Sequence, residues 1–260
     1  MTKKILPLTM LVTLMIFVGC ASAPEMTVEE RFDTIMLQAD EVDYMDTSSN
    51  GIITMVFDAE DLPEPIIMDM TTNQDVILDM SDKDNIKAYQ NVAMSGMGEN
   101  MSMELYILDN ISYMETLGIK MKTALNPADL AQYQEDVSPL MMYSADMDAL
   151  TMEKVDNKYI ITYNVSPDKI ENYREFFDTI IESAGAGTDI KIEFDFINGT
   201  YTVFEDNTIS EATVNMGMTM YIENEVLTAT AEMDYFYNSY NKPVTIEYPN
   251  LEEYIEFPTN

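Results

Sequence analysis

Residues 215–222 read NMGMTMYI, with methionine at every second position from Met216 to Met220. Side chains of a β-strand alternate between its two faces, so this spacing places the three methionines on one face. A second stretch, NMSMELYI at residues 100–107, matches the first at five of eight positions. We interpret the two stretches as similar strands in equivalent roles rather than as a duplication, because such matches also arise by composition in a methionine-rich chain.

Short alternating runs continue on both sides of these stretches and predict an antiparallel meander. Loop-forming residues separate successive runs, which favours hairpins in sequence order. The pair Asn198-Gly199 is the best hairpin signal in the chain, since Asn-Gly suits tight two-residue turns. The predicted strands are 51–57, 66–70, 75–80, 86–94, 101–108, 150–155, 159–165, 189–197, 201–205, 209–223, 226–237 and 244–247.

A capping box predicts a first helix ahead of the sheet. Thr27 can accept a hydrogen bond from the backbone amide of Glu30, and Glu30 can reach back to the amide of Thr27. Apolar residues then recur near one face at helical spacing over about 12 residues. This apolar face must pack on a partner, which we expect to be the sheet. The residues of the helix face are Val28, Phe32, Ile35, Met36 and Ala39.

Three further helices are predicted between the strands. Proline at a first helical position indicates one helix from Pro127 to Gln134 and another from Pro139 to about Met147. The third has the clearest signals, with Ser166 as its cap, Pro167 at its start and Gly185 at its end. Its apolar stripe consists of Ile170, Tyr173, Phe177, Ile180, Ile181 and Ala184.

The charge and the residue counts exclude several classes of function. The chain has 47 Asp and Glu against 13 Lys and Arg, a formal charge of -34, which repels nucleic acid. It has no His, and its single cysteine is Cys20, so disulfides and Ser-His or Cys-His catalysis are ruled out. Two carboxylates could act together as in glycosidases, but in a chain with 47 acidic residues such pairs occur by chance and do not indicate a catalytic site. We therefore predict that the protein is not an enzyme.

The N-terminus has the pattern of a secretion signal. Two lysines precede an uncharged, mostly apolar run over residues 5–18, which is shorter than the roughly 20 residues that a membrane-spanning helix needs. The sequence Phe17-Val18-Gly19-Cys20 resembles the lipobox of bacterial lipoproteins, although Phe17 stands where that motif usually has Leu. The resemblance implies cleavage between Gly19 and Cys20 and attachment of a diacyl lipid to Cys20.

A conventional signal peptide, cleaved after Ala21 or Ala23, is the alternative to lipidation, and an uncleaved anchor helix is another. Either would leave the domain outside the cytoplasmic membrane. With a lipid on Cys20, residues 21–26 span at most about 20 Å before the first helix. The domain would then work close to the membrane while its acidic surface is repelled by anionic headgroups.

Methionine is the outlier of the composition, with 24 residues, and it permits three interpretations. Flexible thioethers on one strand face could line a cavity for acyl chains or other hydrophobic ligands. They could instead replace Leu and Val in a packed core, or supply soft sulfur ligands to Cu(I). The candidate cavity-lining residues are Met101, Met103, Met216, Met218 and Met220.

Oxygen ligands are concentrated in one segment that contains Asp79, Asp82, Asp84 and Asn85. Their spacing does not match an EF-hand, which places ligands at alternate positions, then a Gly and a distant Glu. We interpret the segment as a solvated hairpin loop and predict neither a metal site nor a cofactor.

The layout from about Thr27 to Tyr248 resembles the LolA/LppX-like lipoprotein superfamily, and most of all its Gram-positive members, which are acidic, methionine-rich lipoproteins of unassigned function. The shared features are a capped helix, a long antiparallel meander, a helical insertion and a long helix before the last strands. The resemblance implies an α+β fold, in which a curved antiparallel sheet forms an incomplete β-barrel with helices packed on its concave side. It also implies an apolar cavity and no catalytic motif. The predicted organisation is a signal peptide at 1–19, a lipidated tether at 20–26 and one domain at 27–260.

We therefore predict a noncatalytic lipoprotein on the extracytoplasmic face of the cell membrane, held there by the diacyl anchor on Cys20. It would bind a lipid or another hydrophobic ligand between the curved sheet and the helices, and it would not bind nucleic acid. The first alternative is an envelope interaction or structural module with a filled core, whose clustered acidic patch docks a basic protein partner. The second alternative is a metal-binding lipoprotein.

Overall fold

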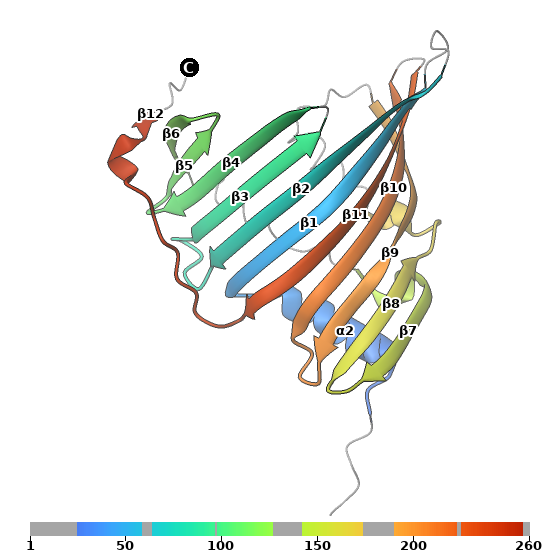
Figure 1. Ribbon diagram of the computed structural model, residues 1–260. Helices are drawn as coiled ribbons and strands as arrows, with labels where there is room; N and C mark the ends of the chain where they lie inside the picture. The colour runs from blue at the N-terminus through green and yellow to red at the C-terminus, as the bar shows by residue number, and fades with distance from the viewer. Residues whose placement is uncertain are drawn as a thin grey trace, which may run out of the picture.

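Long β-strands dominate the computed structural model, which describes residues 25–58, 64–96, 98–126, 142–173, 190–222 and 225–256 (Figure 1). The helix α2 spans Val28–Asp40, and 3-10 turns occur at Ser144–Asp146, Ile170–Tyr173 and Leu251–Glu253. The strands are β1 Tyr44–Asp58, β2 Ile66–Asp79, β3 Lys87–Gly96, β4 Glu99–Leu108, β5 Ile111–Thr116, β6 Ile119–Ala124, β7 Met147–Val155, β8 Lys158–Val165, β9 Ile190–Phe204, β10 Ile209–Ile222, β11 Glu225–Tyr240 and β12 Ile255–Glu256.

One sheet of twelve strands joins two meanders through a central pair of long strands. The spatial order is β12-β6-β5-β4-β3-β2-β1-β11-β10-β9-β8-β7. Neighbouring strands are antiparallel, except that β12 pairs parallel with β6. The register of β1 with β11 runs from Met45 opposite Tyr240 to Asp58 opposite Val226. Strands far apart in the sequence therefore meet at the centre of a broad, twisted surface (Figure 1).

The helix α2 begins at the predicted capping box and packs on one end of the sheet. The hydroxyl of Thr27 accepts from the amide of Glu30 at 3.2 Å, and the Glu30 carboxylate accepts from the amide of Thr27 at 2.9 Å. The predicted helix start is thus confirmed. Phe32, Ile35 and Met36 are buried, and on the sheet they pack with Tyr159, Ile161, Tyr163, Val165, Ile197, Tyr201, Val203, Ile209 and Ala212.

The cross-strand register shows which residues share the side on which α2 packs, called here the inner face. Directly opposed residues of neighbouring antiparallel strands point to the same side of a sheet, and successive residues of one strand alternate between the two sides. Starting from the buried core, one row of opposed residues crosses seven strands from β9 to β4 through Tyr201, Ala212, Tyr235, Ser49, Gln74, Val92 and Met103.

The segment that follows β11 covers the outer face at the other end of the sheet. Tyr106 opposes Tyr113, and Tyr106 is an odd number of residues from the inner-face residue Met103, so both tyrosines point outward. Tyr254 is buried against Tyr113 edge to face, with ring centroids 5.5 Å apart. An ion pair of 2.7 Å between Lys120 and Glu253 holds the same segment. A second, smaller core therefore lies on the face opposite α2.

The predicted α+β class is wrong, because the described chain is mostly β and α2 is its single α-helix. Helices do not form a layer over the sheet in the described residues. The predicted helix over 166–185 begins instead as a turn, in which the amides of Lys169 and Ile170 both donate to the carbonyl of Ser166. A Ser-Pro pair favours turns as well as helix starts. Residues 174–185 lie outside the described residues.

The other two predicted helices fall mainly on residues that the structure does not describe. All of 127–134 lies outside the described residues, and so does 139–141. In the part that is described, Ser144–Asp146 is a 3-10 turn and β7 already begins at Met147. Within the described ranges, no helix combines the length and the hydrophobicity needed to cross a membrane.

The predicted hairpin at Asn198-Gly199 is also wrong, since β9 runs straight through this pair. Gly199 opposes Tyr163 on β8 and Val214 on β10. A Cβ at this position would collide with the carbonyl oxygen of Thr213. The glycine therefore permits a close approach of neighbouring backbones rather than a turn.

Several strand boundaries also differ from the sequence prediction. The predicted strands 66–70 and 75–80 are one strand, β2, and the alternation did not predict β5 or β6. The two methionine repeats do form strands, β4 and β10, as expected. Polar residues inside a long strand thus resemble loop signals.

Candidate functional site

The five predicted methionines lie on the same side of the sheet. Met101 and Met103 of β4 occupy inner positions, and so do Met216, Met218 and Met220 of β10. Four other strands, β3, β2, β1 and β11, separate β4 from β10. The register thus brings them onto one surface, whereas their lining of a single cavity stays a prediction.

Methionines of the central strands join the two repeats, although the predicted cavity-lining residues did not include them. Met55 of β1 opposes Met68 of β2. Met70 lies over Gly96 of β3, where a Cβ would stand 2.7 Å from its Cγ, and Met233 likewise lies over Gly51. The alternation at 68–70 was a usable signal. The pairing of β1 with β11, which puts Met233 beside Gly51, had no local signal. We define the methionine surface as the inner-face methionines Met55, Met68, Met70, Met94, Met101, Met103, Met216, Met218, Met220 and Met233.

Charge is segregated between the two faces of the sheet. In the described strands, no charged residue occupies an inner position of β1, β2 or β3, of β10 from Ala212 to Met220, or of β11 from Leu227 to Tyr237. Outer positions carry acids instead, at Asp69, Asp75, Glu104, Glu232 and Asp234. A chain with 47 acids therefore keeps them off these inner positions, whereas β4 has one at its start, where Glu99 opposes Gly96.

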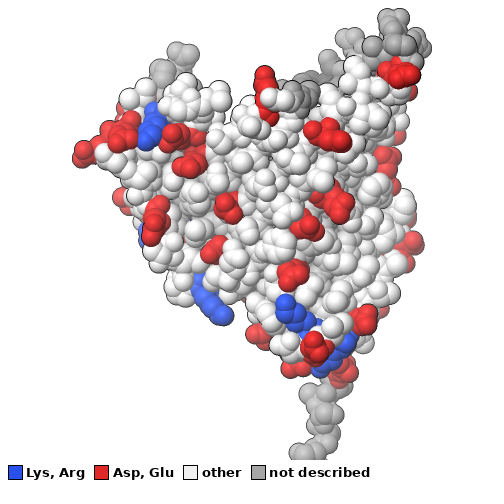
Figure 2. Space-filling model, viewed as in Figure 1, with Lys and Arg blue, Asp and Glu red and all other residues white. Residues whose placement is uncertain are grey.

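The acids of the outer face are spread out. Figure 1 shows α2 behind the sheet, so the face toward the viewer in Figure 2 is the outer one. On that face, Asp and Glu side chains are dispersed among uncharged residues rather than gathered in one patch (Figure 2). The clustered acidic patch predicted for an interaction module does not occur on this view of the molecule.

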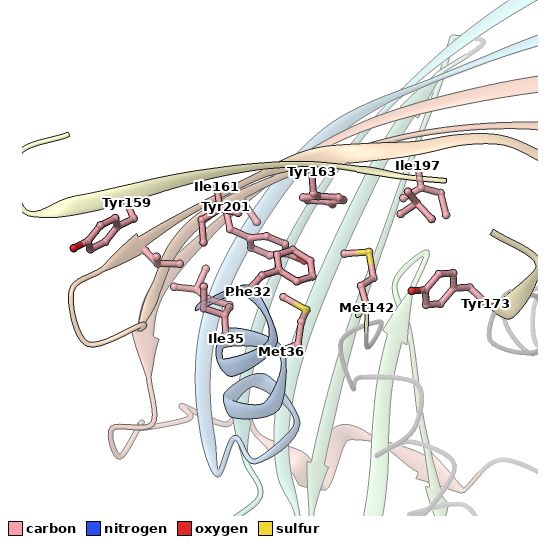
Figure 3. Close-up of a cluster of buried hydrophobic side chains, with 14 of the residues drawn as sticks. Phe32, Ile35, Met36, Met142, Tyr159, Ile161, Tyr163, Tyr173, Ile197 and Tyr201 are labelled. Atoms are coloured by element: carbon pink, nitrogen blue, oxygen red, sulfur yellow. The ribbon is translucent and has the colours of Figure 1, made fainter. Parts of the chain in front are cut away.

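Aromatic side chains fill the end of the inner face beneath α2. The Phe32 ring centroid lies 5.9 Å from that of Tyr163 and 6.1 Å from that of Tyr201, and the two tyrosines stack 5.4 Å apart. Figure 3 shows Phe32, Ile35 and Met36 pointing from α2 toward the sheet. Met36 is 3% exposed. This end, which we call the covered end, is a close-packed core.

Burial raises the pKa of the tyrosines at the covered end. The pKa of Tyr237 rises to about 12, chiefly because its ring is buried and also because of neighbouring Tyr235. Burial likewise raises the pKa of Tyr163 and Tyr201. These hydroxyls therefore remain protonated at neutral pH, where they are neither bases nor anionic ligands.

The inner face is accessible where Met94 of β3 opposes Met101 of β4, which we call the open end, whereas Ala88 and Ile107 at the other end of these two strands are buried with Leu78. Met101 is 50% exposed, and Met94, directly opposite it, is 39% exposed. Every other described methionine is buried or half-buried. Thioether side chains are flexible and polarizable, so this end can adapt to apolar groups of varied shape.

A hollow of about 190 Å³ lies over β2, β3 and β4, but it differs from the predicted cavity. Ligand pockets usually have volumes of roughly 300 Å³ or more. Besides Met94 and Met101, the hollow is lined by residues at outer positions, namely Asn73, Ala93, Ser95, Asn100 and Ser102. We therefore assign the candidate site to the methionine surface and not to this hollow.

The acidic loop between β2 and β3 uses its carboxylates locally. Asp79 accepts from the Ser81 hydroxyl at 2.6 Å, and Asp82 accepts from the amide of Asp84 at 3.1 Å. Residues 81–84 are exposed, which confirms the predicted solvated hairpin loop. In the described part of the chain, no three His, Cys, Asp or Glu side chains converge as metal ligands.

The predicted lipid-attachment residue Cys20 and the cleavage site between Gly19 and Cys20 lie outside the described residues. The first residue that the structure describes is Glu25, whose carboxylate accepts a hydrogen bond from the Tyr159 hydroxyl at 3.1 Å. The chain thus contacts the covered end of the sheet five residues after Cys20.

Comparisons with solved structures give only distant similarities. LprF from Mycobacterium bovis has 14% identity and a TM-score of 0.37, over 85% of this chain and 96% of LprF. A DUF1329 family protein from Desulfovibrio piger has 9% identity and a TM-score of 0.28, over 82% and 94% of the two chains. A beta-barrel-like DUF1849 protein from Brucella abortus has 10% identity and a TM-score of 0.25, over 73% and 97%. Similarities this weak transfer no function.

The sequence itself gives a firmer relationship. No curated protein matches it. One family does match, over residues 27–251, which extend from the cap of α2 to the segment that covers the outer tyrosines. This match spans most of the chain, and the protein therefore belongs to DUF6612, a family of unknown function.

Proposed function

We propose that this protein is a noncatalytic, lipid-anchored protein of the extracytoplasmic membrane face that binds an uncharged hydrophobic ligand on the methionine surface. One observation carries the proposal. In a chain of formal charge -34, the central inner face is free of charge and rich in methionine, and α2 covers one end of it.

The energetics favour an apolar occupant at the open end. Removing apolar surface from water contributes about 25 cal/mol for each Å². A ligand that buries about 200 Å² of protein and ligand surface would gain on the order of 5 kcal/mol before the entropic cost of association. Met94 and Met101 expose the apolar area that such a ligand would cover.

The distribution of charge supports an uncharged ligand. Acids on the outer face repel anions at long range, and the inner positions of β1, β2 and β3 provide no cation that would pair with an anionic head group. Flexible methionine side chains suit acyl chains or other ligands of varied shape better than one rigid molecule.

A binding role without catalysis agrees with the available side chains. The chain has no His, and burial holds the tyrosines of the covered end in their protonated form. The inner positions of the central strands carry no acid that could act as a base or nucleophile.

The proposed anchor would keep the domain close to the bilayer. Glu25, which contacts Tyr159, lies five positions after Cys20, so a lipid on Cys20 would hold the covered end within about 18 Å of the membrane surface. Attachment of two acyl chains is sufficient for stable membrane residence.

Native mass spectrometry combined with a neutral fluorescent probe tests the binding proposal. Residues 21–260 are expressed without the anchor, and solvent extraction identifies any co-purified molecule. The probe N-phenyl-1-naphthylamine is then titrated into the delipidated protein. We expect an apolar adduct at defined stoichiometry and saturable probe binding that membrane lipids displace.

A pair of adjacent charge variants locates the site. Met101→Glu places a carboxylate on the inner face, and Ser102→Glu places the same charge one residue away on the outer face, at a position that is also exposed. We expect Met101→Glu to weaken probe binding about tenfold or more and Ser102→Glu to leave it unchanged. Equal effects of the two variants, or an apo mass that lipids do not change, would contradict the proposal and favour an interaction module.

A further inference from the structure

Methionine is the side chain of the described domain that oxidants attack most readily. The single cysteine is Cys20, which precedes the described residues, and the chain has neither Trp nor His. Oxidants that convert methionine to its sulfoxide therefore find no thiol competitor between residues 25 and 256.

The structure divides these methionines into exposed and protected groups. Met101 is 50% exposed and Met94 is 39% exposed, whereas Met36 and Met142 are each 3% exposed. Oxidation follows access to the sulfur, so the exposed pair should react first. The division separates the open end of the inner face from the covered end.

The two exposed methionines also form one structural unit. Met94 of β3 and Met101 of β4 are directly opposed in the antiparallel register, so their Cβ atoms are about 5 Å apart. Met70 lies beside them on β2, since it packs over Gly96. A chemical change at the pair therefore alters the edge of the methionine surface where ligand would enter.

We infer that Met94 and Met101 form an oxidation switch, in which conversion of both thioethers to sulfoxides releases the hydrophobic ligand. This inference rests on the proposed binding function. The oxidant is a hypohalous acid of the extracellular space. Each sulfur gains one oxygen and loses two electrons while the O–Cl bond of hypochlorous acid breaks, and the products are a sulfoxide, chloride and a proton.

The physical consequence is a polar group on an apolar surface. A sulfoxide is polar and chiral, and it disrupts methionine-rich binding surfaces. A ligand that covers it would desolvate the S–O dipole without replacing its hydrogen bonds to water. We expect oxidation of the pair to weaken binding of an apolar ligand about tenfold, and methionine sulfoxide reductases with a thiol reductant to restore it.

Stepwise oxidation with peptide mapping tests the inference. Residues 21–260 receive increasing amounts of hypochlorous acid, excess oxidant is quenched, and mass spectrometry of proteolytic peptides locates each added oxygen. Probe binding by N-phenyl-1-naphthylamine is measured on the same samples. Met97 lies outside the described residues and is replaced by Leu in every protein compared, so it cannot contribute to the result.

Two double variants provide the matched comparison. Met94→Leu/Met101→Leu keeps the surface apolar but cannot be oxidised there, and Met68→Leu/Met70→Leu removes two half-buried sulfurs of the same face. For each protein the affinity after oxidation is compared with its own affinity before oxidation. We expect this ratio to stay near one in the first variant and to fall about tenfold in the second, as in the parent. Uniform oxygen uptake by all methionines, or unchanged binding after both sulfurs are oxidised, would overturn the switch. Absence of probe binding before oxidation would instead overturn the binding function itself.

Discussion

The two ends of the inner face have the same strand alternation but opposite packing. At the covered end, aromatic rings of α2, β8 and β9 interlock, and the buried methionines of this core, Met36 and Met142, are each 3% exposed. At the open end, Met94 and Met101 are 39% and 50% exposed. Aromatic rings are rigid and pack in one arrangement, whereas methionine side chains are flexible and can adopt many conformations. One face can therefore supply both stability and an adaptable surface.

Removing an aromatic ring from the covered end should have the largest effect. Phe32→Ala leaves a cavity between α2 and two tyrosines, and we expect a loss of about 3–5 kcal/mol in the free energy of unfolding. Met101→Ala should cost about 1 kcal/mol or less, because half of its side chain is already in water. Urea unfolding followed by circular dichroism measures both. Similar losses would show that the two ends do not differ in packing.

Adding a methyl group to a glycine tests how readily the packing at each end adjusts to an extra carbon atom. Gly199→Ala at the covered end forces a Cβ against the carbonyl oxygen of Thr213, and we expect a loss of about 2–3 kcal/mol. Gly96→Ala at the open end meets Met70 Cγ at 2.7 Å and the Asp69 carbonyl oxygen at 3.0 Å. Rotation of the Met70 side chain relieves the first contact but not the second, which is with backbone, so we expect a loss of about 1–2 kcal/mol there. Urea unfolding measures both losses. A larger loss for Gly96→Ala than for Gly199→Ala would contradict the comparison of the two ends.

High pH should lower the stability of the protein through the buried tyrosines, among them those of the covered end. Burial raises the pKa of Tyr237 from 10.0 to about 12, so its contribution is fully present below pH 10 and is lost as pH rises through 12. In this window the unfolded chain has released a proton that the folded chain retains. Each such tyrosine lowers the stability by about 1.4 kcal/mol for each pH unit. Tyr237→Phe should show a shallower decline between pH 10 and 12, and a slope equal to that of the parent would contradict the assignment.

Loss of the helix cap should have a small effect on stability, comparable to that of Met101→Ala, and it tests whether ligand binding depends on the covered end. Thr27→Ala removes the acceptor for the amide of Glu30, and we expect a loss of about 1 kcal/mol in unfolding free energy. Binding of N-phenyl-1-naphthylamine by the folded protein should not change, since α2 covers the end away from Met101. A weaker affinity after this substitution would place α2 in the ligand site.

Local signals in the sequence predicted part of this arrangement. The capping box of Thr27 and Glu30 and the alternation of Met216, Met218 and Met220 each depend on neighbours within a few residues, and the structure contains both features. The Asn198-Gly199 pair failed as a signal because Gly199 meets the backbone of β10, a contact that no neighbouring residue reveals.

By itself, the sequence determined that one face of the strands is apolar, since side chains alternate along any extended backbone. It also determined where α2 begins. Only the tertiary structure decided that β1 pairs with β11, which joins the methionines of β4 and β10 into one surface, and that α2 covers the β8 and β9 end of it. The physical reason is range: alternation and capping depend on adjacent residues, whereas strand pairing depends on contacts between residues almost 200 positions apart, such as Met45 and Tyr240.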